Sequence, residues 1–297
     1  MAHNNHKARR VGLYGAAALV LGGLVYGGFI YRVEPDVLTI LGSADLYLRV
    51  AAILPENGKD GRPLAVREEN LHRVEDAIAE VERREPGLSV SRQFSAYVAY
   101  LRKDHASALR LYGEALSARD FQEAQRPRIL LDMAKLHQEL KQDDQALQIL
   151  AGLKVGPAIA AEAALVQACI LRGRNQVAEA AASLKALASV EVEQGGVLIE
   201  CAQLLAELGE LPAAAELAGR AATRCDAIGL YRIARLKFEA GQVDTALTML
   251  DQAVRADSET VQATLKRDLA VWEPVRSDPR FQDIGKLNQQ PAAAPGR

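Results

Sequence analysis

The longest uncharged stretch of the chain lies close to its start. Residues 11–31 read VGLYGAAALVLGGLVYGGFIY and contain no charged side chain, whereas residues 1–10 carry Lys7, Arg9 and Arg10 and no acid. A helix rises 1.5 Å per residue, so this stretch would extend about 31 Å, enough to cross the hydrocarbon core of a bilayer. The pattern predicts a transmembrane anchor at 11–31 behind a basic tail at 1–10. A cleaved signal peptide fits less well, because the stretch ends in Gly-Gly-Phe-Ile-Tyr rather than in small residues.

The charges on either side of this stretch predict the orientation of the chain. Three basic residues precede it, and a mixed flank with Arg32, Glu34 and Asp36 follows it. Because basic residues favour the cytoplasmic side, we expect a single-pass protein of the bacterial inner membrane, with a cytoplasmic N-terminus and repeats that are periplasmic or otherwise extracytoplasmic. The inverted orientation stays open, since only three charges decide between the two.

Two glycines of the predicted anchor, Gly23 and Gly27, have the G-x-x-x-G spacing that lets membrane helices pack closely. They indicate a homodimer formed through residues 11–31, although glycine is also common in membrane helices that do not pair. The lipid bilayer is the other contact expected of this segment.

The region that follows, residues 32–64, divides into an apolar part and a loop. Residues 36–54 are mostly apolar and predict a short helix that either lies on the membrane surface or opens the folded domain. Residues 55–63, PENGKDGRP, have the composition of a loop. From residue 65 onward Ala, Leu, Glu, Gln, Lys and Arg dominate, and no stretch alternates apolar and polar positions. An all-α fold is therefore expected.

Five segments between residues 89 and 258 repeat one pattern, in which a helix and a tight turn lead into a second helix that begins near a small residue. The matching alanines recur about every 34 residues. They are Ala108, Ala146, Ala178, Ala214 and Ala246. Glycine stands five residues before three of them, at Gly173, Gly209 and Gly241, where a sharp turn between helices needs a permissive backbone.

This pattern resembles the tetratricopeptide repeat (TPR) family, whose units are helical hairpins of about 34 residues. The resemblance covers residues 89–258, and a degenerate half-repeat precedes it at 66–86, with Ala77 as the small residue. It implies a right-handed solenoid of TPR-like helical hairpins over residues 65–258. Stacked hairpins in such a solenoid bury apolar stripes that one hairpin cannot bury alone. The tryptophan of the family's first helix is absent from these repeats.

Residues 259–285 are expected to cap the array with further helices. The stretch WEPVRSDPRF resembles a closing segment found after TPR arrays in bacterial proteins. Trp272, Val275 and Phe281 would cover the apolar end of the last repeat. Residues 286–297, rich in Ala, Pro and Gln, predict a disordered tail.

Composition and missing motifs narrow the function. The chain has 297 residues and a formal net charge of −2, which argues against nucleic acid as a partner, since that ligand needs a basic surface. The sequence contains no phosphate-binding loop, nucleophile elbow or H-E-x-x-H motif, so we expect no catalytic residue, no cofactor and no metal. Cys169, Cys201 and Cys225 predict buried thiols rather than a disulfide framework. An enzyme with an atypical site is a hypothesis that only a deep pocket of perturbed titratable groups would support.

The resemblance also implies a binding surface. In the family the first helices line a concave groove. The corresponding outward positions here are Gln93, Tyr97, Tyr100, Arg128, Lys135, Gln138, Gln167, Gln203, Tyr231, Arg235 and Phe238. This set is polar and mildly basic with aromatic ends, and Tyr and Arg are enriched at binding hot spots. It predicts a protein or peptide ligand with some acidic character, unless several of these side chains pack between helices instead.

The leading hypothesis is a membrane-anchored scaffold or adaptor that holds partner proteins during assembly or chaperoning at the cell envelope. Two alternatives keep the same fold, namely a cytoplasm-facing regulator of a membrane complex and a structural homo-oligomer. The fold does not decide among them, because repeat solenoids host many unrelated roles.

Overall fold

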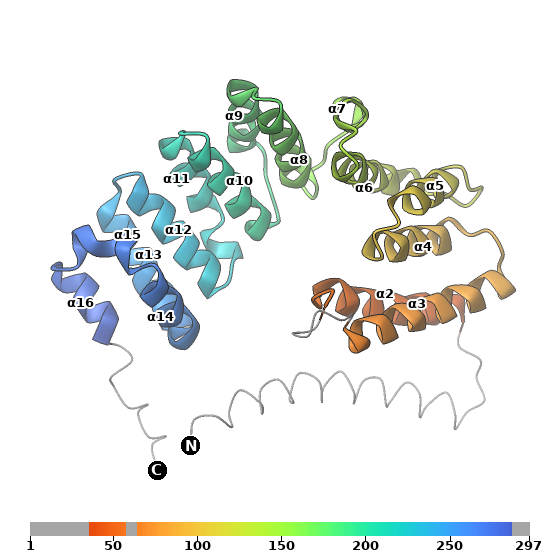
Figure 1. Ribbon diagram of the computed structural model, residues 1–297, viewed down its shortest axis with the longest axis horizontal. Coiled ribbons are helices and arrows are strands. Elements are labelled where there is room, and N and C mark those ends of the chain that lie inside the picture. The colour runs from red at the N-terminus through yellow and green to blue at the C-terminus, as the bar shows by residue number, and fades with distance from the viewer. Residues whose placement is uncertain (1–35, 58–63, 287–297) are drawn as a thin grey trace, which may run out of the picture. The chain divides into compact units, whose positions relative to one another are not determined.

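The computed structural model describes residues 36–57 and 64–286, and no β-strand occurs within these ranges (Figure 1). The α-helices are α2 (Val37–Ile53), α3 (Ala65–Arg84), α4 (Ser89–Leu101), α5 (His105–Leu116), α6 (Arg126–Glu139), α7 (Asp143–Gly152), α8 (Ala160–Gly173), α9 (Val177–Lys185), α10 (Gly195–Glu207), α11 (Leu211–Arg220), α12 (Ala227–Glu239), α13 (Val243–Ala256), α14 (Ser258–Arg267), α15 (Leu269–Trp272) and α16 (Pro279–Lys286). Short 3₁₀ turns are η2 (Glu123–Gln125), η3 (Ala186–Ser189), η4 (Ala222–Arg224) and η5 (Glu273–Val275). The all-α prediction is confirmed for this part of the chain.

Several expectations concern residues outside the described ranges. The basic tail at 1–10, the anchor at 11–31 with Gly23 and Gly27, and residues 287–297 lie there. None of the helices formed by residues 36–57 and 64–286 has the length and apolar content that a bilayer crossing requires. The membrane anchor stays a prediction from the sequence.

The described chain forms two compact units, and each is described by itself. Unit 1 ends at Gln122 and holds the hairpins α2–α3 and α4–α5. Unit 2 starts at Glu123 and holds α6–α7, α8–α9, α10–α11 and α12–α13, followed by α14 to α16. A single hairpin cannot bury both of its faces, so neighbouring hairpins supply the missing partner. In unit 2, for example, α10 packs on both α8 and α12.

Five of the tight turns inside hairpins share one backbone geometry. Each has a residue at positive φ that stands five positions before an alanine of 0% exposure in the second helix. The pairs are Lys103 with Ala108, Lys141 with Ala146, Asn175 with Ala180, Gly209 with Ala214, and Gly241 with Ala246. The N–H of the following residue reaches back into the first helix, as where Gln176 donates to the Leu171 carbonyl at 2.9 Å. This bond satisfies a carbonyl that the end of the helix would otherwise leave without a partner.

The third repeat has a different register from the one that the sequence predicts. Ala178 is exposed and Ala180 is completely buried, so Ala180 is the alanine that packs. The left-handed residue of this turn is Asn175, with a φ of 63°, and not Gly173. Asparagine adopts this conformation more readily than most residues with a side chain, so the turn does not require glycine.

The helix α2 opens unit 1 and is part of its core. Asp36 caps the helix by accepting a hydrogen bond from the Thr39 N–H at 2.7 Å. On the buried side, Ala44 packs in one cluster with Leu71 of α3. The described part of unit 1 therefore includes α2 and does not start near residue 65. A complete hairpin, α2–α3, stands where the sequence indicates only a half-repeat at 66–86.

A buried arginine joins the two hairpins of unit 1. Arg67 is 6% exposed and donates from Nη2 to the Leu101 carbonyl at 2.8 Å and from Nε to the Ala51 carbonyl at 3.3 Å. These carbonyls belong to the last turns of α4 and α2, where backbone C=O groups lack partners within the helix. One guanidinium thus satisfies the ends of two helices.

Unit 2 ends in a capping layer, α14 to α16, built around Trp272. This side chain is 0% exposed, and its ring centroid lies 4.8 Å from that of Phe238 and 5.9 Å from that of Phe281. Val275 is buried in the same cluster, which includes residues of α12 and α13. These contacts confirm the predicted packing of Trp272, Val275 and Phe281 over the last repeat.

Candidate functional site

The first helices of successive hairpins in unit 2 lie next to one another. α6 contacts α8, α8 contacts α10, and α10 contacts α12 (Figure 1). Polar side chains link them in pairs, namely Arg128 of α6 with Glu162 of α8, Arg172 of α8 with Glu207 of α10, and Gln203 of α10 with Arg232 of α12. We call the surface of α6, α8, α10 and α12 that carries these pairs the first-helix face.

At the α6 end of this face, two bases and two acids form a partly buried network. Glu162 accepts hydrogen bonds from Arg128 at 2.9 Å and from Lys135, and Asp132 lies 3.2 Å from Arg128. Burial raises the pKa of Asp132 in spite of these two bases. Burial acts in the same direction on Glu162, but the hydrogen bond and charge of Lys135, together with Arg128, outweigh it and lower the pKa. Arg128 and Lys135 are therefore already paired with acidic side chains of the protein itself.

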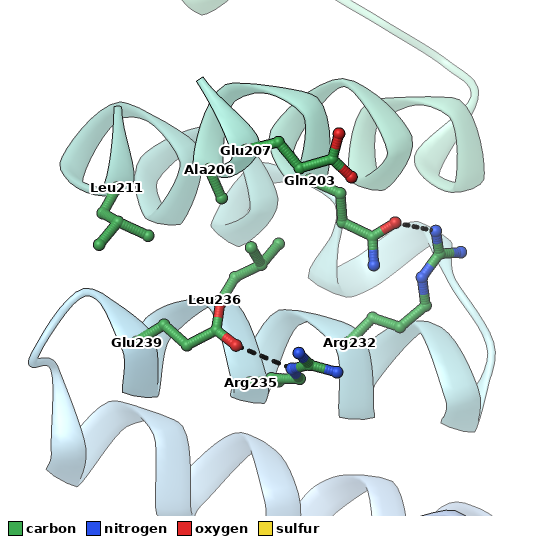
Figure 2. A pocket seen from close by; sticks show the side chains of 8 residues that line it. All are labelled: Gln203, Ala206, Glu207, Leu211, Arg232, Arg235, Leu236 and Glu239. Atoms are coloured by element: carbon green, nitrogen blue, oxygen red, sulfur yellow. Dashed lines mark hydrogen bonds and ion pairs between the residues drawn. The ribbon is translucent and has the colours of Figure 1, made fainter. Parts of the chain in front are cut away.

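Between α10 and α12 the first-helix face is hollowed (Figure 2). This hollow has a volume of about 400 Å³ and is lined by Gln203, Ala206, Glu207, Leu211, Arg232, Arg235, Leu236 and Glu239. Leu236 is buried, and Ala206 and Leu211 are half-buried. Figure 2 shows these three apolar side chains pointing into the space between the two helices, with the polar ones around them. An apolar base with a few polar groups is the usual composition of a small binding site.

The two arginines of the hollow have different partners (Figure 2). Arg235 donates from Nε to Glu239 at 2.8 Å and lies 3.6 Å from Asp268, and its hydrogen bond with Glu239 raises its pKa. Arg232 is half-buried and donates to the side-chain carbonyl of Gln203, which is neutral. Within residues 36–57 and 64–286, no carboxylate forms an ion pair with Arg232. Its charge thus remains available to a ligand.

The prediction that Tyr231 lies at an aromatic end of the groove is wrong. This side chain is 2% exposed, donates its hydroxyl hydrogen to Asp268 at 2.9 Å and accepts a hydrogen bond from Trp272 Nε1 at 3.4 Å. Burial raises its pKa to about 12. Phe238 is half-buried against the ring of Trp272. Both aromatic side chains contribute to the junction with the capping layer, because that layer packs on α12.

The other predicted groove residues of unit 2 all lie on first helices. Gln203 and Arg235 line the hollow. Arg128 and Lys135 belong to the charged network described above, and Gln138 and Gln167 are half-buried on α6 and α8. Their part in binding a partner stays a prediction.

The predicted groove residues of unit 1 lie together on α4. Gln93, Tyr97 and Tyr100 are half-buried, and the rings of the two tyrosines are 5.8 Å apart. Tyr97 packs against the core cluster of this unit. A role for these residues in binding also stays a prediction.

Sequence analysis does not predict four residues of the pairs that define the first-helix face, namely Glu162, Arg172, Glu207 and Arg232. One feature of the sequence could have identified Glu162. It is the only acidic residue of α8, and the first half of this helix is otherwise mostly alanine. A signal exists for Arg232 as well. It stands three residues before Arg235, and residues at this spacing are neighbours on one side of a helix.

The described residues offer no evident catalytic or metal chemistry. Within residues 36–57 and 64–286, no group of His, Cys, Asp and Glu could hold a metal ion. All three cysteines are free, and burial raises their pKa, to about 12 for the buried Cys201. Cys169 and Cys225 are half-buried. The thiols are therefore held in the protonated, poorly nucleophilic form.

Comparison with known proteins identifies a fold and no family. No protein-family profile and no curated protein sequence matches the chain. Among solved structures, yeast Tom70 matches with a TM-score of 0.52 and 12% identity, over 92% of this chain and 62% of that one. PilF of Pseudomonas aeruginosa matches with a TM-score of 0.45 and 16% identity, over 77% of this chain and 99% of that one. A tetratricopeptide repeat protein from Parabacteroides merdae matches with a TM-score of 0.43 and 17% identity, over 83% and 93%. The match to Tom70 shows a likeness of fold alone, and residues 36–57 and 64–286 form the successive helical hairpins that the resemblance to the TPR family predicts.

Proposed function

We propose that this protein is a membrane-anchored scaffold that holds a segment of a partner protein in the hollow between α10 and α12. The observation that carries the proposal is the environment of Arg232, a half-buried cation that faces a neutral amide beside Leu236 and Leu211. An arginine offers a carboxylate two parallel hydrogen bonds, and it gains more from them where water is partly excluded. The hollow therefore suits an acidic side chain with an apolar neighbour.

The size and mixed charge of the hollow favour a peptide over a highly charged small molecule. Its volume of about 400 Å³ is near the lower end for ligand pockets. Glu207 and Glu239 stand on its rim together with the two arginines. These glutamates would repel a polyanion such as a nucleotide, whereas a peptide presents both donors and acceptors.

The predicted anchor at residues 11–31 would place this binding site at a membrane. A hollow of this size supports modest affinity, and confinement to a membrane raises the effective concentration of a partner in the same membrane. We propose that the repeats lie outside the cytoplasm, and that the protein acts in assembly or chaperoning at the bacterial cell envelope.

The orientation is tested by the accessibility of one cysteine. Ala293→Cys, in a background without the native cysteines, is treated with a membrane-impermeant thiol reagent after the outer barrier of the cells is opened. Labelling with the inner membrane intact supports an extracytoplasmic solenoid. Labelling only after lysis overturns this orientation and favours a cytoplasmic regulator of a membrane complex.

The binding role is tested by photo-crosslinking in cells. A photoreactive amino acid replaces Ala206, which lines the hollow, and a matched protein carries it at Ala178, an exposed alanine on α9 of the same unit. We expect a distinct adduct from position 206 and none from 178. The adduct should contain another protein, and the linked segment should hold an acidic residue.

Two results would count against this function. Equal adducts from both positions would show that the hollow does not select a partner. An adduct of the chain with itself would support a structural homo-oligomer in place of a scaffold for other proteins.

A further inference from the structure

The outer side of α2 exposes a row of apolar side chains. Leu38, Leu46 and Ile53 are 78%, 37% and 82% exposed. Gly42 and Arg49 fall between them, so that successive members of the row are three or four residues apart. With 3.6 residues per turn, these five positions share one side of the helix. We call this row the outer stripe of α2.

No described helix of unit 1 covers the outer stripe. The opposite side of α2, with Ile40, Ala44, Leu48 and Ala51, is buried, and α3 and α4 are the helices that pack on α2. A Cβ added at Gly42 would meet no described atom within 4 Å, so there is open space at the middle of the stripe. The helix therefore presents a second apolar side that does not pack on the described helices of unit 1. An exposed apolar surface of this kind indicates an interaction site.

The charge on the stripe suits the boundary between lipid headgroups and acyl chains. Arg49 is its only ionisable residue, and its Nε lies 2.7 Å from Asp45 one turn earlier. An arginine at such a boundary packs its stem on apolar groups and extends its head into the polar layer. Helices that lie in a membrane interface bury one apolar side in the same way.

The place of α2 in the chain indicates what covers the stripe. The uncharged segment ends at Tyr31, and α2 begins at Val37. Six peptide units reach at most about 22 Å, since an extended chain spans up to 3.6 Å per residue. If residues 11–31 cross a bilayer, the start of α2 lies within that distance of its surface. An apolar helix side this close to lipid has the bilayer as its nearest partner.

We propose that α2 lies along the membrane, with its outer stripe at the boundary between the lipid headgroups and the acyl chains. This inference rests on the proposed anchor at 11–31. The short connection to that anchor favours lipid as the occupant over a second copy or a partner protein. Since α3 packs on the buried side of α2, the contact holds unit 1 at the membrane surface.

The test uses the full chain reconstituted in phospholipid vesicles. A cysteine replaces Leu38, Leu46 or Ile53, one at a time, in a background without the native cysteines, and carries an environment-sensitive fluorophore. The matched control is a cysteine at Ala106, an exposed position on α5 of the same unit. We expect the three stripe labels to lose most of their emission when the lipids carry a nitroxide just below the headgroup. The label at 106 should keep its emission and respond instead to a quencher dissolved in the water.

Alkaline extraction of the same vesicles separates failure of the anchor from failure of the α2 contact. If the chain stays in the membrane and the stripe labels remain open to the water-soluble quencher, the α2 proposal is overturned while the anchor stands. If the labels are shielded from water but not quenched by the lipid nitroxide, a protein surface covers the stripe and lipid contact is overturned. If extraction releases the chain, the anchor fails and the α2 proposal fails with it.

Discussion

Tyr231 and Asp268 share a hydrogen bond of 2.9 Å in which the buried tyrosine hydroxyl donates to the carboxylate. Tyr231 lies on α12 and Asp268 directly follows α14, so the bond joins the last repeat to the capping layer. Trp272 donates to the same hydroxyl from its indole N–H. The cap is thus held by a polar network as well as by apolar packing, and such a network in a buried setting fixes one arrangement of its members.

Removing this hydroxyl should weaken the junction. We expect Tyr231→Phe to lower the free energy of unfolding by about 1–2 kcal/mol, because Asp268 and Trp272 both lose a partner. Trp272 is the only tryptophan of the chain, so its fluorescence during urea unfolding reports this region. Ser189→Ala removes an exposed hydroxyl from the same unit and serves as the control. A midpoint shared by wild type and Tyr231→Phe would contradict a stabilising role for the bond.

The same tyrosine predicts an alkaline limit to stability. Burial, together with the hydrogen bond and charge of Asp268, raises the pKa of Tyr231 from 10.0 to about 12. The folded protein then holds the proton more tightly than the unfolded chain. The contribution of Tyr231 is complete below pH 10 and is lost as the pH rises towards 12. The difference in stability between wild type and Tyr231→Phe should shrink over this interval. A difference that stays constant there would refute the assignment.

The network between α6 and α8 predicts unequal effects for its two acids. Glu162 accepts from both Arg128 and Lys135. We expect Glu162→Gln to lower the free energy of unfolding by about 1–3 kcal/mol, since two partly buried bases lose their main partner. Asp132→Asn should cost less, because burial already disfavours the charged form of Asp132 and raises its pKa. Each variant removes one charge at nearly constant shape, so each is the control for the other. Urea unfolding at neutral pH, monitored by circular dichroism, measures the free energy of unfolding of each variant. Equal losses for the two variants would argue against unequal contributions of Glu162 and Asp132.

The hairpins could be predicted from the sequence because their turns place strict demands on the backbone and on residue size. Where one small residue follows the turn at the right distance, as Ala108 and Ala146 do, the register is correct. It fails in the third repeat, because alanines stand at both 178 and 180 and only the backbone conformation of Asn175 decides between them. The place of α2 in the fold could not be predicted from the sequence either, because its apolar outer stripe is typical of a membrane segment and not of a repeat helix.

The candidate site could be predicted less well, because its contacts join residues that are far apart in the chain. Arg128 and Glu162 are separated by 34 positions, about one repeat, so the pattern places them on successive first helices but does not show that their side chains form an ion pair. Tyr231 and Arg232 are neighbours, yet one is in the core and the other lines the hollow. A shift of one residue turns a helical side chain by about 100°, enough to exchange a groove position for a buried one. Tyr231 packs with Trp272 of the capping layer, which no repeat pattern describes.

The corrected register of the third repeat makes a prediction of its own. Ala180→Leu adds volume at a completely buried position and should lower the free energy of unfolding by about 1–3 kcal/mol. Ala178→Leu, on the exposed side of the same helix, should change it by no more than about 0.5 kcal/mol. Thermal unfolding followed by circular dichroism compares the two variants directly. The reverse order would restore the register that places Ala178 in the core.

The hollow predicts opposite effects for its two kinds of charge. Arg232→Gln removes the cation that faces only a neutral amide, and it should weaken capture of the partner segment about ten- to hundredfold, the worth of one hydrogen bond to a charged group. Glu239→Gln releases Arg235 from its hydrogen-bonded carboxylate and makes the hollow more positive, so it should strengthen capture. The yield of adduct from a photoreactive residue at position 206 measures both effects.

A surface arginine outside the hollow separates local contact from general charge. Arg255→Gln makes the same change in net charge on α13, where Arg255 pairs with Asp251 at 2.7 Å. Long-range attraction between exposed charges is screened by salt, whereas a contact inside a half-buried hollow is screened much less. If the hollow holds the partner, Arg232→Gln keeps its defect at high salt and Arg255→Gln captures as wild type does at any salt. If Arg232→Gln and Arg255→Gln instead weaken capture equally, and both defects disappear in high salt, Arg232 acts only by long-range attraction. The partner would then bind elsewhere on the chain.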